Sequence, residues 1–406
     1  DWYSRERKWI LTTLKTSHLA PCQRSATFLR KASMPKLFVL TVFLFLIVLE
    51  SFAQTTEPHL EEMIKLPKLP FQIKDYGGTM WWQSDFVSND SARYLRLRFA
   101  EVKNPNSEAI NIVIRDKQGI ELARVDTRIL VPDQPWISPL LMTNSVRASI
   151  ESSKRPKGFS LVLSSYFFSK SDPRQLSVPN TPDPWKSIST ISQNSAEIKW
   201  AQSVVNIIST DTNQSCTGFI VGSDLIVTNE HCAELSERFR KNRKSCNDLQ
   251  IQLDFNAESS TRVYAGCAEA VSGKGIDVAV LKVRAADRDK LKNRPILKLA
   301  TAMKHPLEVE VIHHPAGLSK MISPPCKLLD FDAGKKLLRH DCNTIPGSSG
   351  SPIFDMATGV VAALQVQGYP NMSKPEYDLR SARGEKFYNF AVPAAQIRKL
   401  FTDLTD

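Results

Sequence analysis

Three short segments of the chain contain residues whose types suit chemistry on a substrate. They are Val227-Thr-Asn-Glu-His231-Cys232, Gly275-Ile-Asp277-Val and Pro346-Gly-Ser-Ser349-Gly-Ser-Pro352. Alone, each has an ordinary reading as a structural histidine, a turn aspartate and a tight turn. A serine hydroxyl becomes a nucleophile, however, when an imidazole takes its proton and a carboxylate orients that imidazole. The order His, Asp, Ser therefore predicts acyl transfer through an activated serine.

The α/β-hydrolases are the obvious competing class of serine enzyme. Their nucleophile elbow reads G-x-S-x-G, whereas position 351 of this chain is serine. Their chain order is Ser, Asp, His, the reverse of the order here. Both differences exclude that class.

Together the three segments resemble the chymotrypsin-like serine proteases, most closely the bacterial branch with trypsin-like and glutamyl-endopeptidase-like members. The histidine motif is Thr-Asn-Glu-His231-Cys232 and the serine motif is Gly347-Ser-Ser349-Gly350-Ser-Pro. The resemblance covers about residues 200–400. It implies an all-β fold, with two β-barrels carrying the site between them.

The resemblance also assigns roles to these residues. His231 would be the general base and later the acid, Asp277 would hold the imidazole, and Ser349 would form an acyl-enzyme. The backbone amides of Gly347 and Ser349 would bind the oxyanion, each worth roughly 3–4 kcal/mol. No cofactor and no metal are implied.

Two departures from the trypsin pattern affect activation and specificity. Ser348 stands where trypsin-like zymogens carry the aspartate that receives a new N-terminus, so activation by that ion pair is not expected. Asn343 stands at the floor of the pocket for the substrate's P1 side chain and supplies no charge, although Asp341 is close by. The segment with Gln365 and Gly368 is the expected substrate-binding strand, and it lacks the histidine of glutamate-specific relatives. A small or polar P1 residue is favoured.

The remaining histidines near these motifs are His313, His314 and His340. They flank the predicted site in sequence, which allows contact with substrate. Surface or structural roles are nevertheless favoured, because such histidines more often pack than react.

Six of the seven cysteines lie in the second half of the chain, which favours disulfides in an oxidising compartment. They are Cys216, Cys232, Cys246, Cys267, Cys326 and Cys342. Six cysteines allow 15 pairings, and the sequence alone does not choose among them. The resemblance supports Cys216–Cys232, and sequential pairing would add Cys246–Cys267 and Cys326–Cys342. The sequence contains no C-x-x-C pair, the spacing that would suggest a zinc site.

The N-terminal 53 residues have the layout of an export signal. Met34 and Lys36 precede thirteen uncharged residues, 37–49, and Ser51-Phe-Ala53 provides small residues for cleavage. We therefore expect a signal peptide at 34–53 and an untranslated upstream extension at 1–33. A run of thirteen residues is shorter than the ~20 that span a membrane.

Composition is that of a globular protein, with 42% hydrophobic and 23% charged residues over 406. This excludes wholesale disorder, collagen and coiled coil, and the length favours two domains. The net charge of +11 becomes mild once residues 1–53 are removed, with 45 basic against 39 acidic residues remaining. Such a balance does not indicate nucleic-acid binding.

A proline-rich stretch at 172–185 predicts a linker between two β-rich parts. The part at 54–171 has short strands at 94–99, 110–114 and 159–163, typical of a small antiparallel β-sandwich. Its Trp81, Trp82 and Trp136 could line a binding surface, but core positions are favoured.

The part at 186–406 is expected to be the protease domain. Its predicted strands are at 218–221, 225–228, 249–253, 278–283, 309–312 and 360–366, and its predicted helix begins at 394.

These observations predict a secreted or periplasmic serine endopeptidase. Its partners would be protein or peptide substrates. We expect no nucleic-acid partner, no stable membrane insertion after signal cleavage, and a monomer. The alternative is a catalytically inert protease homologue that acts as a binding or regulatory module. The role of 54–171, as binding domain or pro-region, stays open.

Overall fold

The computed structural model describes most of the chain after residue 61. The described residues are 62–66, 72–74, 76–132, 134–170, 185–257, 262–273, 275–368, 379–380, 382–384 and 387–405. For residues 401–405, only the backbone is described. The predicted upstream extension, the signal peptide and positions 172–184 of the linker lie outside them. None of the helices in the described ranges is long and apolar enough to cross a membrane.

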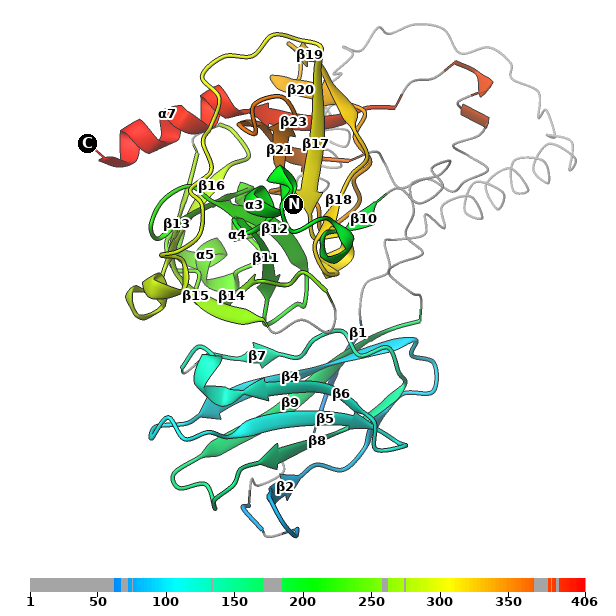
Figure 1. Ribbon diagram of the computed structural model, residues 1–406, viewed down its shortest axis with the longest axis vertical. Coiled ribbons are helices and arrows are strands. Elements are labelled where there is room, and N and C mark those ends of the chain that lie inside the picture. Colours follow the sequence, from blue (N-terminus) through cyan, green and yellow to red (C-terminus); the bar gives the residue numbers. More distant parts are fainter. Residues whose placement is uncertain are drawn as a thin grey trace, which may run out of the picture. The chain divides into compact units, whose positions relative to one another are not determined.

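The first part of the described chain is an antiparallel sandwich of two sheets around one core (Figure 1). We call it the N-terminal sandwich. The first sheet has the order β1 (Glu62–Lys65), β9 (Ser160–Ser169), β4 (Tyr94–Lys103), β7 (Trp136–Ile137). The second has the order β2 (Met80–Gln83), β8 (Ser145–Glu151), β5 (Asn111–Asp116), β6 (Glu121–Asp126), with β3 (Val87–Ser88) also paired to β8.

Alternation along the strands produces the sandwich core, because successive side chains point to opposite faces. On β4, for example, Leu95, Leu97 and Phe99 are fully buried in the core. Trp136 is also buried and stacks on Phe99, and Trp82 packs against the same core. The predicted sandwich is confirmed, and these two tryptophans have the core positions that were favoured.

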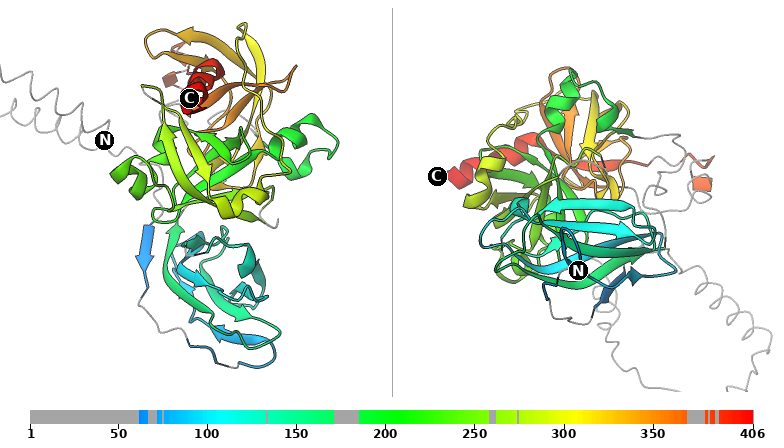
Figure 2. Two further views of the ribbon diagram at one scale, coloured as in Figure 1. Left: turned by 90° about the vertical axis from the view of Figure 1, so that its left-hand side faces the viewer. Right: turned by 60° about the horizontal axis from the view of Figure 1, so that its bottom comes forward.

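The second part contains two closed six-stranded barrels, as predicted. The first barrel has the order β11 (Val204–Ser209), β12 (Ser215–Ile220), β13 (Leu225–Thr228), β16 (Ala279–Val283), β15 (Val263–Ser272), β14 (Leu249–Leu253). The second has the order β17 (Leu307–His313), β19 (Cys326–Asp332), β20 (Leu337–His340), β23 (Asn389–Pro393), β22 (Val361–Gln367), β21 (Pro352–Asp355), and β21 pairs back onto β17. Figure 2 shows both barrels from two further directions.

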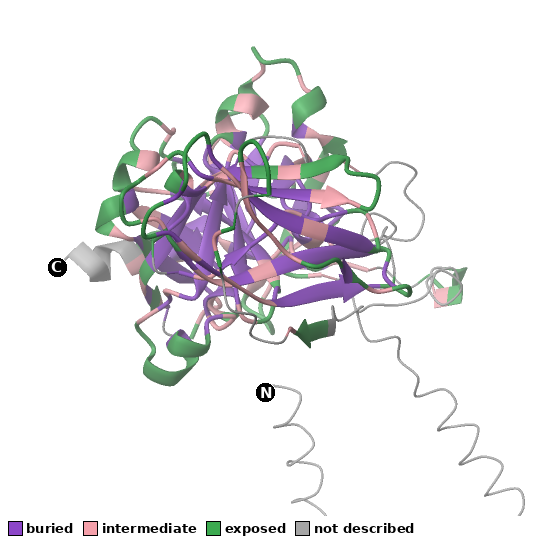
Figure 3. Ribbon diagram, turned by 90° about the horizontal axis from the view of Figure 1, so that it is seen from below, coloured by how far each residue is buried: buried purple, intermediate pink, exposed green. Residues whose placement is uncertain are grey.

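Short elements extend and connect the barrels. Strands β10 (Lys186–Ser187) and β18 (Met321–Ile322) extend the sheet of the second barrel beyond β17. Helix α3 (Ala196–Ala201) precedes β11, and helices α4 (Glu230–Ala233) and α5 (Glu237–Asn242) lie between β13 and β14 of the first barrel. The predicted C-terminal helix is α7 (Ala394–Thr405), which buries Ala394 and Ile397. Figure 3 shows that the strands carry most of the buried residues.

Short 3₁₀ helices also connect the strands. They are η1 (Thr127–Ile129), η3 (Ile188–Thr190), η4 (Ala285–Lys290) and η5 (Pro315–Gly317).

Three disulfides tie neighbouring segments of the barrels together. They join Cys216 to Cys232, Cys246 to Cys267, and Cys326 to Cys342. The closed loops span 16 to 21 residues. Cross-links of this length stabilise a fold by about 3 kcal/mol each, in the chain-entropy view.

Arginines on β4 attach the N-terminal sandwich to both barrels. Arg98 forms an ion pair with Asp211 at 2.7 Å and also donates to the backbone oxygen of Thr210. Arg96 is 4% exposed and donates to Gly317 O at 3.2 Å. Tyr264 of β15 is packed within the sandwich core itself. Burying a guanidinium is costly unless it is hydrogen-bonded, so these contacts fix the position of the sandwich against the barrels.

Glu310 on β17 is a buried carboxyl that forms no salt bridge with any residue that the structure describes. It is 4% exposed, and its Oε1 has no hydrogen bond within the described residues. Burial, with a smaller contribution from Glu197 on α3, raises the pKa of Glu310 from its ordinary 4.5 to about 7. The folded chain therefore binds this proton more tightly than the unfolded chain does.

Replacing Glu310 by Gln is expected to remove a pH-dependent loss of stability. The contribution of Glu310 is fully present below about pH 4.5 and is lost as the pH rises through about 7. The loss amounts to at most about 3 kcal/mol. In denaturant unfolding with the disulfides intact, Glu310→Gln should gain stability at pH 8 but not at pH 5. Equal changes at both pH values would contradict this account.

Candidate active site

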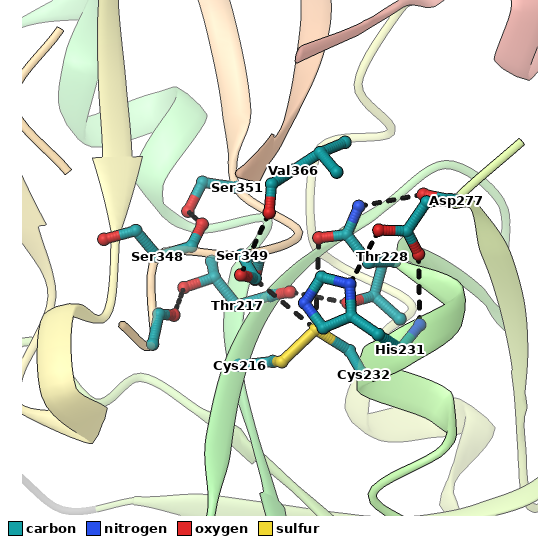
Figure 4. The surroundings of a disulfide bond; sticks show 12 residues. Cys216, Thr217, Thr228, His231, Cys232, Asp277, Ser348, Ser349, Ser351 and Val366 are labelled. Carbon is teal, nitrogen blue, oxygen red and sulfur yellow. Dashed lines mark hydrogen bonds and ion pairs between the residues drawn. A yellow bond between two sulfur atoms is a disulfide. The ribbon is translucent and has the colours of Figure 1, made fainter. Parts of the chain in front are cut away.

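His231 is presented by the short helix α4, directly after strand β13. Its backbone N donates to Asp277 Oδ1 at 3.1 Å, and its ring Nδ1 is 2.7 Å from Asp277 Oδ2. The side chain is 44% exposed, so the other ring nitrogen is accessible. The Cys216–Cys232 disulfide ties the residue after His231 to β12 (Figure 4).

Asp277 comes just before β16, in the first barrel like His231. Asn229 Nδ2 donates to its backbone oxygen at 2.9 Å, which fixes the segment against α4. Burial by itself would raise the pKa of Asp277. Hydrogen bonds from the side chain and backbone of His231 outweigh that effect and hold the pKa below its ordinary value. The carboxylate is therefore charged at neutral pH, and it favours the tautomer with a proton on Nδ1.

Ser349 lies on the loop before β21 of the second barrel, between two glycines with positive φ. These are Gly347 at +93° and Gly350 at +84°. A Cβ at Gly347 would lie 2.6 Å from Ala316 N, and one at Gly350 would lie 2.0 Å from Thr217 O. Only glycine fits either position, because both the backbone conformation and the space exclude a side chain.

Thr217 of β12 joins the serine loop to the first barrel. Its N donates to Ser349 O at 2.8 Å, and its Oγ1 donates to Gly347 O at 2.9 Å. The same hydroxyl accepts from His314 N at 2.9 Å. The backbone and side chain of this one residue thus hold Ser349, Gly347 and the residue after β17 in a fixed relation.

The amides of Gly347 and Ser349 do not donate to any hydrogen bond within the described part of the chain. The carbonyls on either side of the Gly347 amide are engaged elsewhere, since Ala316 N donates to Pro346 O at 2.7 Å and Thr217 binds Gly347 O. Two free amides beside a serine hydroxyl suit an oxyanion.

The serine and the histidine are brought together at the disulfide. Cys232 Sγ is 3.8 Å from Ser349 O, and a ring nitrogen of His231 lies within 4.8 Å of the same sulfur. Ser349 Oγ donates to Val366 O at 3.4 Å (Figure 4), and no hydrogen bond to His231 is formed. Such bonds are commonly loose without substrate.

Cys216, Cys232 and His231 also approach one another as metal ligands would. Both sulfurs are consumed in a disulfide, however, and provide no thiolate. The chemistry of this donor set therefore does not fit zinc.

The predicted substrate residue Gln365 uses its side chain inside the second barrel. Its Oε1 is 2.5 Å from His340 Nε2, and its Nε2 donates to Thr344 Oγ1 at 3.1 Å. Burial lowers the pKa of His340 to about 4, although the bond to Gln365 opposes this. The His340 imidazole is therefore uncharged at neutral pH.

Gly368 and Asn343, the other predicted substrate residues, lie near residues that the sequence did not single out. A Cβ on Gly368 would be 3.7 Å from Asn389 Oδ1 and 3.8 Å from Thr344 O. Asn389 Nδ2 donates to the oxygen of Cys342, next to Asn343. Asp341 is exposed, and its Oδ1 accepts from Lys327 N at 2.6 Å. The sequence did not identify Asn389 as a substrate residue, because Asn389 and its partner Cys342 are 47 residues apart and their spacing follows no structural period.

Ser348 and His313 form a buried pair behind the serine. His313 Nδ1 is 2.7 Å from Ser348 Oγ, and neither residue is exposed. Burial lowers the pKa of His313 to about 3. His314 is also buried, binds Leu318 O through Nδ1 at 3.0 Å, and has its pKa held well below the ordinary value by burial. All three histidines therefore have the structural placement that was favoured.

Part of the chain is similar to a known protein family and to solved structures. Residues 216–364 match the family model of the trypsin-like peptidase domain. The serine endoprotease from Yersinia pestis is 19% identical over 53% of this chain and 66% of that chain, just under two thirds of its length, with a TM-score of 0.38. The active form of the Rv3671c protease from M. tuberculosis is 17% identical over 55% of this chain and 90% of that chain, with a TM-score of 0.36. No curated protein matches the chain in sequence.

The two barrels form a chymotrypsin-like fold, and most of the segment that builds them, residues 216–364, matches a trypsin-like peptidase domain. The serine-protease resemblance seen in the motifs is confirmed at this level.

Gly350→Ala is expected to destabilise the fold by several kcal/mol, because its Cβ would collide with Thr217 O and Thr228 Oγ1. Gly275→Ala is a matched control, since Gly275 has φ +74° but no atom within 4 Å of the added Cβ. The control should cost about 1–2 kcal/mol from backbone strain alone. Denaturant unfolding of both variants measures the difference. Equal losses would show that space around Gly350 is not the constraint.

Proposed function

We propose that this protein is a serine endopeptidase that hydrolyses peptide bonds through His231, Asp277 and Ser349. The observation that carries the proposal is the double contact of Asp277 with the ring and backbone of His231, at 2.7 and 3.1 Å, beside Ser349. An inert homologue has no need for an oriented imidazole at an accessible serine. The family match supports the same reaction class.

In the proposed mechanism, Ser349 Oγ attacks the scissile carbonyl carbon as its proton passes to His231 Nε2. The charged Asp277 stabilises the imidazolium that results. The carbonyl oxygen becomes an oxyanion, which the amides of Gly347 and Ser349 bind. His231 then gives its proton to the leaving amine, and an acyl-enzyme forms. Water, deprotonated by His231, hydrolyses that ester and restores the serine.

A small or polar P1 residue is part of the proposal. The groups near Gly368, at the expected P1 site, are the backbone oxygen of Thr344 and the amide side chain of Asn389, both uncharged. Asp341, the nearest carboxylate in sequence, is engaged with a backbone amide. Selection of lysine or arginine needs a negative charge at this site, and none of these described groups supplies one.

We also propose that the protein is exported to the cell exterior or the periplasm and acts there on proteins or peptides. Three formed disulfides suit an oxidising compartment. The predicted signal at 34–53, the N-terminal β domain at 54–171, the linker at 172–185 and the protease domain at 186–406 complete this organisation.

A fluorophosphonate probe should label the mature chain, 54–406, on Ser349, and peptide mapping would locate the adduct. Ser349→Ala should abolish both labelling and peptide hydrolysis without changing the unfolding midpoint, because the hydroxyl makes one weak hydrogen bond. His231→Ala should abolish labelling as well. A folded wild-type chain that is not labelled would favour the binding-module alternative.

Asp277→Asn should lower kcat by roughly 10³–10⁴-fold with little change in KM, because the amide no longer selects the tautomer with a proton on Nδ1. Asp341→Asn is the matched control, as Asp341 is an exposed carboxylate that accepts one backbone hydrogen bond. The control should retain kcat within about twofold. A loss below tenfold in Asp277→Asn would argue against its role.

A further inference from the structure

Trp185 contacts the serine loop although it lies outside every barrel strand. It immediately precedes β10, at the end of the linker. Its Nε1 donates to Asn343 O at 3.0 Å, across 158 residues of sequence. Its ring meets the ring of His313 edge to face, with centroids 5.4 Å apart and planes at 77°.

His313 continues this contact into the loop that precedes the nucleophile. We call residues 343–348 the active-site loop. His313 Nδ1 is 2.7 Å from Ser348 Oγ, which also accepts from Ile345 N at 3.2 Å. Ser348 N in turn donates to Ile345 O at 2.9 Å. Trp185 therefore touches one end of the loop directly and the other end through His313.

The geometry of this loop decides whether two amides can bind an oxyanion. The loop contains Gly347 and runs directly into Ser349. Thr217 and Ala316 hold its carbonyls from the side of the first barrel and β17. Trp185 and His313 provide support at Asn343 and Ser348. A shift of about 1 Å at a reacting group can cost on the order of 100-fold in rate, so this support has a direct kinetic consequence.

We propose that Trp185 is a positioning residue that keeps the active-site loop in its oxyanion-binding shape, through Asn343 and the His313–Ser348 pair. The inference rests on the proposed peptidase activity. The support is part of the continuous chain and involves no newly formed terminus. The trypsin-like ion pair that Ser348 cannot make is thereby replaced by an aromatic contact and uncharged hydrogen bonds.

A purely structural tryptophan would lower stability without changing catalysis, and Trp200 provides that comparison. Trp200 is also half-buried and stacks on Phe354, with centroids 5.0 Å apart and planes at 16°. A Cβ on Gly359 would lie 2.6 Å from its ring, so it is tightly packed. It has no described contact with the active-site loop.

The experiment compares Trp185→Ala, Trp185→Phe and Trp200→Ala in the mature chain, at a temperature where all are folded by circular dichroism. Peptide hydrolysis gives kcat and KM, and the fluorophosphonate gives a labelling rate at Ser349. Trp185→Ala should lower kcat and the labelling rate by about 10- to 100-fold, with a much smaller change in KM. Trp185→Phe, which keeps a ring but loses the N–H, should fall between Trp185→Ala and wild type.

Hydrogen exchange provides a readout that does not depend on activity. The amides of Ile345 and Ser348 donate within the loop. Their exchange rates should rise at least tenfold over wild type in Trp185→Ala and stay at the wild-type value in Trp200→Ala. Unchanged kcat and exchange in Trp185→Ala, or equal effects of both alanine variants, would overturn the inference. Failure to label wild type on Ser349 would instead overturn the proposed peptidase activity, while the exchange result would still decide whether Trp185 supports the loop.

Discussion

The hydrogen bonds of Thr217 join the two halves of the candidate site. The histidine and aspartate come from the first barrel and the serine from the second, so their relation depends on contacts across the barrels. Thr217 donates its amide to Ser349 O and its hydroxyl to Gly347 O, and it accepts from His314 N. The close approach leaves no room for a side chain at Gly350, which accounts for the glycine there.

The second barrel contains three buried histidines that are uncharged at neutral pH. His313, His314 and His340 are fully buried, and burial lowers the pKa of each. Neutral imidazoles can bind hydroxyl, amide and carbonyl partners without the cost of a buried charge. The loop that carries the serine is thus supported by bonds that do not titrate near neutral pH. His231 differs from these three histidines in being exposed to solvent.

The sequence predicted those parts of the fold that have local signals. The strands at 225–228 and 249–253 have the predicted bounds, because short apolar runs between turn residues identify them. The tight turn around Ser349 was predicted because glycines flank that serine in a specific order. Strand β15 was missed, since Glu269 and other partly exposed residues interrupt its apolar pattern.

Contacts between distant residues could not be predicted in this way. The bond from Trp185 to Asn343 spans 158 residues, and that from His313 to Ser348 spans 35. Each joins two polar atoms whose residue types are common and whose spacing has no period. Gln365 illustrates the same limit, because the strand was identified while the engagement of its amide with His340 and Thr344 was not.

Tyr264 shows how closely the N-terminal sandwich and the first barrel share their interiors. It belongs to β15 of the barrel, yet its ring packs in the sandwich core and meets Trp136 edge-on at 6.3 Å. Ile208 of β11 is likewise packed against Ile137 and Phe167 of the sandwich. Expressed without the sandwich, the barrels would present these apolar side chains to water. Production of the barrels alone would therefore face poor solubility, and a soluble form would need polar replacements at these two positions.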